Sequence, residues 1–391
     1  MTIDALNTSA RRMLEQEILP FWMERMQDPR GGFYGRIDGN NVLHPEAPKG
    51  AILCARILWT FSAAYRVLGK EEYLAVATRA KRALLDDFFD SEQGGVFWSL
   101  NADGTPLDTK KQIYAIGFAI YGLSEYARAT NDEEALAHAV KLFFGTESHS
   151  FDPVKNGYFE AFTREWGDIA DMRLSDKDAN ERKTMNTHLH ILEPYTNLYR
   201  VWPDSRLRAA IRNLIDIFLT KILDASTHRM HLFFNDDWQS MTPGTSYGHD
   251  IEASWLIHEA MNVVDDSSCD SCAEGTSVPQ VLAPWFQTLL TLDPLAQPRQ
   301  WWEYAEAVVG YLNIWQHTSD DMAMKKMQET WTFITDCLID RETGEWFWSV
   351  TPEGVPLRAE DKAGFWKCPY HNGRMCLEII ERLPEHLPDA L

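Results

Sequence analysis

A phrase that starts with Asp and ends in a short aromatic run recurs along the chain. Five copies are clear, and they start at Asp28, Asp90, Asp152, Asp224 and Asp340. The first three are 62 residues apart, whereas the last two are 116 residues apart, about two periods. We therefore expect a sixth, degenerate copy near residues 265–285. Self-similarity at a long fixed period is typical of repeat architectures.

The segments between the copies carry helical patterns, as in GAILCARILWTFSAAYRVLG and KQIYAIGFAIYGLSEYARAT. Apolar residues recur in them at three- and four-residue spacing. An interval of about 60 residues fits two helices, and the aromatic phrase fits a short β-hairpin at one end of each pair. Six helical hairpins closed in a ring predict an all-α (α/α)6 barrel. We expect one catalytic domain over residues 1–391. An open helical solenoid and two separate bundles are the alternatives.

Composition limits the partners. The formal net charge of −21 disfavours nucleic acid, anionic lipid and polyanionic substrates, because all three need basic surfaces. A neutral oligosaccharide or monosaccharide remains compatible. The N-terminus lacks the apolar run of a signal peptide, and no stretch approaches the roughly 18 apolar residues of a membrane span. We therefore expect a cytoplasmic protein without nucleic-acid or membrane partners, as a monomer or a weak homodimer.

The six cysteines do not indicate a disulfide framework, because Cys54 and Cys337 lie in apolar helical patterns. Metal motifs are weak too. His249 and Glu252, or Cys368 and His371, supply two ligands each without the spacing of a zinc site. The CxxC pair Cys269 and Cys272 has no partner motif, so we expect neither a metal nor another cofactor.

Polar residues embedded in apolar helical runs are candidates for a cavity lining. Arg56 is one, and it could equally pair with an acid in the core. Other candidates share a helix face in pairs: Asn186 with His190, His249 with Glu252, and Trp302 with Glu306. Each pair has a structural alternative, above all a buried histidine with satisfied hydrogen bonds. Near the C-terminus, GFWKCPYHNGRM allows a structural His371, a metal ligand or an acid/base group.

Three segments, KTMNTHLHILEPYTNLYR, GHDIEASWL and GFWKCPYHNGRMCLE, together resemble the cellobiose 2-epimerases of the N-acylglucosamine 2-epimerase superfamily. The likeness extends over nearly the whole chain and implies an (α/α)6 barrel. One segment differs, since the chain reads WWEYAE where that family usually reads WWPQAE. The rim near residues 269–301 is therefore the part to which the likeness extends least.

The resemblance implies a role for each candidate. His249 and His371 would be the paired acid/base groups, and Arg56 and His190 would stabilise the oxyanion. Glu252 would orient His249, and Asp178 would reach the second sugar. Sugar-binding and supporting positions would be Tyr114, Asn186, Glu252, Trp302, Glu306 and Trp366.

The implied reaction is epimerisation at C2 of the reducing-end glucose of β-1,4-linked disaccharides through a cis-enediolate. A mannose 2-epimerase or mannose isomerase on the same scaffold is the nearest alternative. An inverting glycosidase would instead use two carboxylates, Glu252 and Glu306. A non-catalytic sugar-binding protein would leave the sugar unchanged.

Overall fold

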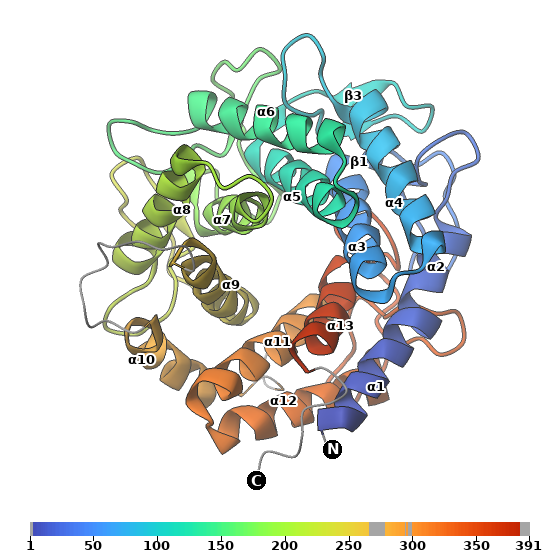
Figure 1. Cartoon of the computed structure of the whole chain (residues 1–391), viewed down its shortest axis with the longest axis vertical. Helices are drawn as coiled ribbons and strands as arrows, with labels where there is room; N and C mark the ends of the chain where they lie inside the picture. The colour runs from blue at the N-terminus through green and yellow to red at the C-terminus, as the bar shows by residue number, and fades with distance from the viewer. Residues whose placement is uncertain (1–2, 266–277, 294, 296–298, 384–391) are drawn as a thin grey trace.

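The helices form two concentric rings around one axis in the computed structural model, which describes residues 3–265, 278–293, 295 and 299–383 (Figure 1). The inner ring consists of α3 (Ala51–Leu68), α5 (Ile113–Thr130), α7 (Met185–Tyr199), α9 (Tyr247–Asp265), α11 (Trp301–Thr318) and α13 (Tyr370–Arg382). The outer ring consists of α1 (Ile3–Met13) with α2 (Leu19–Arg25), α4 (Glu71–Ala83), α6 (Glu133–His149), α8 (Ser205–Ile217), α10 (Val278–Thr291) and α12 (Asp321–Phe333). The predicted (α/α)6 barrel is confirmed.

Hydrophobic patterning explains the two rings. The outer helix α8 is amphipathic and buries Leu207, Ala210, Ile211 and Leu214, which recur along one face. Inner helices are apolar on nearly every side, as in α3, and such helices need protein on all faces. By length and composition α3 is long and apolar enough to cross a membrane, with a mean hydropathy of 1.4, but 78% of it is buried inside the protein. The expectation that no stretch approaches a membrane span is therefore wrong for α3 by length and composition, although the helix lies in the core of the barrel.

Inner helices approach one another closely where a glycine faces a neighbouring backbone. A Cβ atom built on Gly117 of α5 would lie 2.2 Å from the carbonyl oxygen of His190 on α7. No side chain fits at that distance, so glycine allows the two helices to pack at this point. The contact also fixes the height of His190 in the ring.

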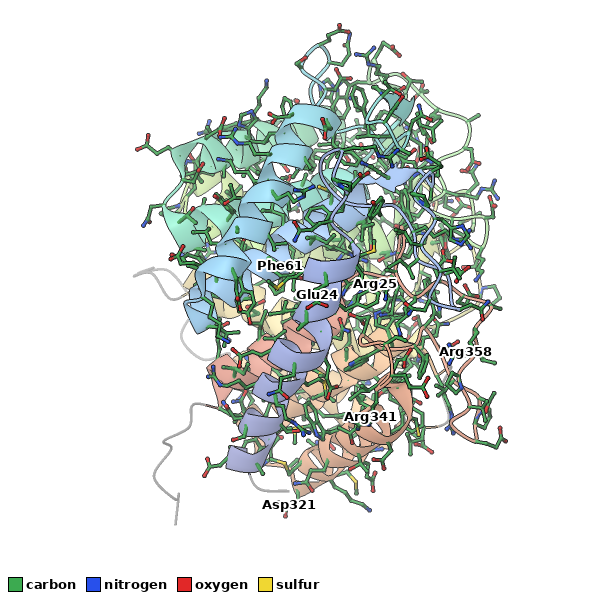
Figure 2. The ribbon with its side chains drawn as sticks, turned by 90° about the vertical axis from the view of Figure 1, so that its right-hand side faces the viewer. Glu24, Arg25, Phe61, Asp321, Arg341 and Arg358 are labelled. Atoms are coloured by element: carbon green, nitrogen blue, oxygen red, sulfur yellow. The ribbon has the colours of Figure 1, made fainter. Side chains whose placement is uncertain are left out.

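Short antiparallel strand pairs precede the inner helices, as the sequence predicts. One sheet has the order β1 (Lys49–Gly50), β2 (Ser99–Leu100) and β3 (Pro106–Asp108). The other two sheets pair β4 (Lys111–Gln112) with β5 (Ala161–Phe162) and β6 (Lys183–Thr184) with β7 (Phe233–Phe234). Seen from the side in Figure 2, the long loops, including the one with Arg358, gather at one end of the barrel.

The repeated Asp has the same role in several copies. Its carboxylate accepts backbone N–H groups two or three residues ahead, as Asp90 does from Glu92 and Gln93. The other oxygen contacts a lysine that lies just before an inner helix. The pairs are Asp28–Lys49, Asp90–Lys111 and Asp152–Lys183, each at 2.8 Å, and Asp340–Lys362.

Each of these four ion pairs therefore ties the turn after one outer helix to the approach of the next inner helix. The outer helices α4, α8 and α12 reach that turn through π-helical segments, which are η2 (Leu84–Phe88), η3 (Phe218–Ile222) and η5 (Ile334–Leu338). A further π-helical segment, η1 (Leu14–Ile18), joins α1 to α2. Asp224 departs from the pattern, because it binds its own turn and the basic Arg229 pairs with Asp250 instead. The predicted sixth copy lies largely outside the described residues, as do Cys269 and Cys272.

At the C-terminal ends of the inner helices a belt of polar contacts runs around the whole ring. Every adjacent pair of inner helices is joined by one contact between side chains. The contacts are Arg66–Glu381, Arg66–Glu125, Asn197–Ser124, Arg200–Glu259, His258–Asn313 and Arg382–Asn313. The belt lies at the end of the barrel opposite the strand pairs, and its side chains line a cavity of about 200 Å³ there.

We predict that Asp152→Asn destabilises the protein by about 3 kcal/mol, because it leaves the fully buried Lys183 without its counter-ion. Urea unfolding at pH 7 measures this loss. Burial raises the pKa of Asp152, but the hydrogen bond with Lys183 prevails and lowers it. The stabilisation is therefore present above the unfolded pKa of about 4 and disappears as pH falls.

The matched control is Asp237→Asn, which breaks the exposed pair with Lys155. Exposed pairs contribute about 1 kcal/mol or less, so this variant should unfold close to the native midpoint. Equal losses in both variants would contradict a special role for the repeated buried pair.

Candidate active site

The residues singled out in the sequence lie at the N-terminal ends of the inner helices. Arg56 lies in the second turn of α3, Tyr114 in the first turn of α5, and His190 in the second turn of α7. Trp366 and Asp178 come from the loops that precede α13 and α7. The same end of the barrel receives Asn186 from α7, His249 and Glu252 from α9, Trp302 and Glu306 from α11, and His371 from α13.

A pocket of about 300 Å³ opens at this end. Three predicted residues, Asp178, Asn186 and His249, lie on its wall together with Ser246 and Glu160. The remaining wall is largely apolar and includes Met172, Leu174, Met185 and Phe233. An apolar wall with a few polar groups is the usual composition of a small-molecule site.

His371 is held by a carboxylate from the neighbouring helix. Its Nδ1–H donates to Oε1 of Glu306 at 2.7 Å, and the indole N–H of Trp255 donates to the other oxygen at 3.1 Å. Glu306 is 1% exposed, so bulk water does not compete for these two hydrogen bonds. The second ring nitrogen of His371, Nε2, is left without a protein partner among the described residues.

His190 is held in the same manner within its own helix. Its Nδ1 lies 2.9 Å from Oε2 of Glu193, one turn further along α7. The hydroxyl of Tyr370 donates to the other oxygen of Glu193. The ring of His190 also packs edge-on against Tyr114, with centroids 4.8 Å apart.

One guanidinium joins the two histidine–carboxylate pairs. Arg374 is fully buried, and its Nη1 donates to Glu193. Its Nη2 donates to Glu306 at 2.6 Å and to Glu252 at 2.8 Å. Helices α7, α9, α11 and α13 therefore meet at a single cation. We call Arg374 with these three carboxylates the arginine cluster.

His249 has a different partner from the one expected. Its Nδ1 lies 2.7 Å from the hydroxyl of Ser246, in the turn where α9 begins. Glu252 bonds to Arg374 instead, so the expectation that Glu252 orients His249 does not match the structure. Glu252, one turn further along α9, bonds to Arg374, whereas Ser246, which precedes the helix, lies beside the ring of His249.

The two proposed acid/base histidines contact the same indole. The ring centroid of Trp302 lies 4.8 Å from that of His249 and 5.8 Å from that of His371. The indole N–H of Trp302 donates to Gln300 at 3.1 Å, which fixes the orientation of the ring. His249 and His371 therefore lie on one side of the barrel axis, close enough to act on one small molecule.

Arg56, Tyr114 and Trp366 form a second group of contacts at this end of the barrel, beside α13. Arg56 donates to the hydroxyl of Tyr114 at 2.8 Å, and its guanidinium lies over the ring of Phe118 at 4.1 Å. Trp366 contacts Tyr114 edge-on with a centroid distance of 6.0 Å. Aromatic faces hold Arg56 in place, so the cation has little freedom to move.

Burial lowers the pKa of both acid/base candidates. It lowers the pKa of His371 to about 3, although the hydrogen bond to Glu306 acts in the opposite direction. Burial, with repulsion from His190 and His371, lowers the pKa of His249 to about 3. Both imidazoles are therefore neutral at pH 7 in the protein without substrate, and each has a lone pair that can accept a proton.

Two sets of side chains have the composition of a metal site, and they share Glu252. The ligand atoms of His190, Glu193 and Glu252 lie within 4.8 Å of one another, as do those of Glu252, Glu306 and His371. Arg374 bonds to all three of these carboxylates. The guanidinium thus provides the positive charge that a metal ion would bring to either set.

The sequence reasoning missed Glu193, Arg374, Tyr370 and Ser246. Two of them carry a local signal, since Glu193 and Arg374 each follow a candidate histidine by three residues and so share its helix face. His188, by contrast, has both ring nitrogens satisfied by the backbone, at Thr184 and Tyr158. His188 is therefore a structural histidine.

Comparison with known proteins shows the family to which the chain belongs. The sequence model of the N-acylglucosamine 2-epimerase (GlcNAc 2-epimerase) family matches residues 32–373. The cellobiose 2-epimerase of Bacteroides fragilis is 58% identical over 389 residues, which cover 96% of this chain and 99% of that protein. The D-mannose isomerase of Thermobifida fusca is 22% identical and covers 90% of this chain and 88% of its own.

A solved structure shows the same fold. The cellobiose 2-epimerase of Bacillus thermoamylovorans B4167 superposes with a TM-score of 0.90 at 40% identity, over 97% of this chain and 99% of that one. The ring of helices and the sequence match point the same way. The chain belongs to the N-acylglucosamine 2-epimerase family of sugar isomerases.

Proposed function

We propose that this protein inverts C2 of the reducing-end glucose in β-1,4-linked disaccharides, converting cellobiose to glucosyl-mannose and lactose to epilactose. The observation that carries the proposal is the placement of His249 and His371 against Trp302, each with its Nδ1 held by a partner. The 58% identical protein of Bacteroides fragilis bears the name cellobiose 2-epimerase.

Epimerisation at C2 needs two proton transfers on opposite faces of one carbon. The sugar ring must first open, because only the aldehyde makes the C2 proton acidic. Removal of that proton leaves a cis-enediolate, and its return on the other face inverts C2. Imidazoles suit both transfers, since the neutral ring accepts a proton and the imidazolium gives one, and their usual pKa lies near working pH.

The hydrogen bonds assign different roles to the two histidines. Because His371 donates its Nδ1–H to a carboxylate, Nε2 holds the lone pair, and Glu306 stabilises the imidazolium that forms. His249 has a neutral hydroxyl, that of Ser246, in the corresponding place. We therefore assign removal of the C2 proton of glucose to His371 and protonation of the opposite face to His249. His249 first takes the proton of the C1 hydroxyl as the ring opens, while the ring oxygen takes a proton from solvent, and it then delivers that proton to C2. His371 returns its proton to the C1 oxygen as the ring closes and the ring oxygen releases its proton to solvent.

Negative charge develops on the sugar oxygens during this step. Arg56 is a fixed cation beside α13, and Tyr114 accepts one of its hydrogen bonds, so that the O–H of Tyr114 has no acceptor among the described residues. His190 adjoins Tyr114. Pre-oriented donors of this kind stabilise an enediolate at little cost in reorganisation, which supports the assignment of Arg56 to this role. His190 can donate to the enediolate only as an imidazolium, because its Nδ1–H already donates to Glu193.

The pocket favours a disaccharide over a monosaccharide. Its volume of about 300 Å³ would hold roughly ten water molecules and extends from His249 to Asp178. Asp178 is oriented by Ser175, whose backbone N–H and hydroxyl both donate to Oδ2, so that Oδ1 is left for a ligand. Asn186 lies between, with a side-chain oxygen that has no partner among the described residues.

The glycosidase alternative fits the geometry less well. Ligand oxygens of Glu252 and Glu306 lie within 4.8 Å of each other, and both accept from Nη2 of Arg374. An inverting glycosidase needs about 6.5–9.5 Å between carboxyl groups to place a water. A mannose isomerase remains the second candidate, since it uses the same proton at C2.

The test is product analysis after incubation of EDTA-treated protein with cellobiose, lactose and mannose separately. We expect mannose-ended disaccharides, and we expect His249→Ala and His371→Ala to lower kcat at least about 100-fold. The half-buried His138 on the outer helix α6 supplies the control, because it lies outside the inner ring and His138→Ala should leave kcat unchanged. Conversion of mannose alone would overturn the disaccharide assignment, and free glucose would overturn the mechanism.

A second prediction concerns the outer sugar. We expect Asp178→Ala to lower kcat/KM for cellobiose roughly tenfold relative to mannose, the effect of one lost hydrogen bond to a charged group. Asp176→Ala is the matched control, since the side chain of Asp176 is fully exposed and does not line the pocket. Equal losses with both sugars would show that Asp178 acts on the fold rather than on the second sugar.

A third prediction follows from the lowered pKa values of His249 and His371, both about 3. Since kcat/KM reports the protonation of the free protein, it should remain high at pH 5.5, where an ordinary histidine is already mostly protonated. The measurement is kcat/KM from pH 5 to 8, with circular dichroism at each pH to confirm that the protein is folded. A decline with a midpoint near 6.5 in folded protein would contradict the expectation.

A further inference from the structure

The arginine cluster has an unequal count of charges. Three carboxylates, Glu193, Glu252 and Glu306, accept hydrogen bonds from the single guanidinium of Arg374. All four side chains are at most 1% exposed. If every carboxyl group were ionised, the cluster would hold a net charge of −2 away from water. Such a charge is strongly unfavourable in a buried site.

The three carboxylates differ in their remaining partners. Glu193 also accepts from His190 and Tyr370. Glu306 also accepts from His371 and from Trp255. Each of these two groups therefore has three donors, which is the environment of a stable carboxylate.

Glu252 has a single donor among the described residues, Nη2 of Arg374, and it shares that atom with Glu306. One of its oxygens thus has no donor at all. Of the three acids, Glu252 has by far the least compensation for a negative charge. When carboxyl groups share a site, the least compensated one retains its proton.

The titratable and charged groups around Glu252 come from every inner helix that faces it. They are Glu193 and His190 from α7, Glu306 from α11, Arg374, His371 and Tyr370 from α13, Tyr114 from α5, and His249 on α9 itself. Burial and then the charge of Glu306 raise the pKa of Glu252 well above its usual value. Burial also raises the pKa of Glu306, but Arg374 and His371 outweigh burial and lower the pKa of that group below its usual value.

We propose that Glu252 is a neutral carboxylic acid in the resting protein, so that the arginine cluster contains one guanidinium, two carboxylates and one stored proton. Glu252 is then a positioning residue that sets the charge of the site. The catalytic consequence rests on the proposed function. With Glu252 neutral the cluster has a net charge of −1, which one imidazolium balances when a histidine takes the C2 proton.

An ionised Glu252 would have the opposite effect. The cluster would then carry −2, and it would hold the proton on the imidazolium of His371 too firmly for His371 to release it at the end of the reaction cycle. Activity should therefore decline on the alkaline side as Glu252 ionises. The isosteric Glu252→Gln variant copies the neutral acid and has no proton to lose.

The test is an infrared difference spectrum between the native protein and Glu252→Gln at pH 7, in water and in heavy water. We expect the variant to lack one carbonyl band of a protonated carboxyl group, a band that shifts in heavy water. Burial raises the pKa of Glu160 and of Glu303 to about 8, so their bands persist in both proteins and cancel. A difference spectrum with carboxylate bands alone would overturn the proposal.

Thermal unfolding gives a second readout. A raised pKa means that the native protein loses stability as pH rises through the folded value, whereas the Gln variant does not. The Tm of Glu252→Gln should stay within about 3 °C of native at pH 7 and should rise relative to native as pH increases to 9. A Tm difference that is constant from pH 6 to 9 would contradict the proposal.

Glu306→Gln is the matched control on the neighbouring helix. That carboxyl group is ionised in our account, so its neutral copy should lower the Tm at pH 7 by about 5 °C or more. Similar losses in Glu252→Gln and Glu306→Gln would show that both acids are ionised. Neither readout uses a substrate, so a failure here is distinct from a failure of the proposed epimerase activity.

Discussion

The guanidinium of Arg374 is the interaction on which the functional end of the barrel depends. It is the point where four of the six inner helices meet, through Glu193, Glu252 and Glu306. Two of these carboxylates hold an imidazole each, so the position of one buried cation determines where His190 and His371 point. Removing a partner from such a buried network leaves uncompensated charge, which explains why the fold and the chemistry cannot be altered separately here.

The two ends of the inner ring have different tasks. Within the described residues, the N-terminal ends carry polar atoms for which the protein supplies no partner, namely Nε2 of His371, the side-chain oxygen of Asn186 and Oδ1 of Asp178. At the C-terminal ends the polar side chains are paired with one another in a belt that joins each inner helix to the next. Buried Asp–Lys pairs then attach the outer helices to this frame. The scaffold therefore holds the N-terminal ends of the inner helices in fixed positions, which suits an enzyme that must hold two histidines at fixed distances.

The sequence predicted the ring because the repeat is a local property. Each copy of the Asp phrase contains its own turn, and its period sets the number of helical hairpins. The lysine partners Lys49, Lys111 and Lys183 were not predicted, since each lies 21 or more residues beyond its Asp and has no pattern that marks it. A buried ion pair of this kind becomes visible only when the turn and the next helix are placed together.

The site was predicted only in part, because most of its contacts join residues that lie far apart in the sequence. The grouping of His249 with His371 came from the resemblance to a family rather than from spacing. Arg374 lies 181 residues from Glu193 and 122 from Glu252, so no local pattern could connect them. The expected contact of Glu252 with His249 relied on their spacing of one turn, and it did not hold, because Arg374 offers Glu252 a stronger partner.

The most direct test of the two-histidine account is the fate of the C2 proton. Cellobiose is incubated with the protein in heavy water, and the mannose-ended product of the earliest turnovers is examined by NMR. Proton removal and return by imidazoles predicts deuterium at C2 of the product, at one atom per molecule. Product with ordinary hydrogen fully retained at C2 would contradict the account, because the hydrogen would then never have passed through an exchangeable histidine.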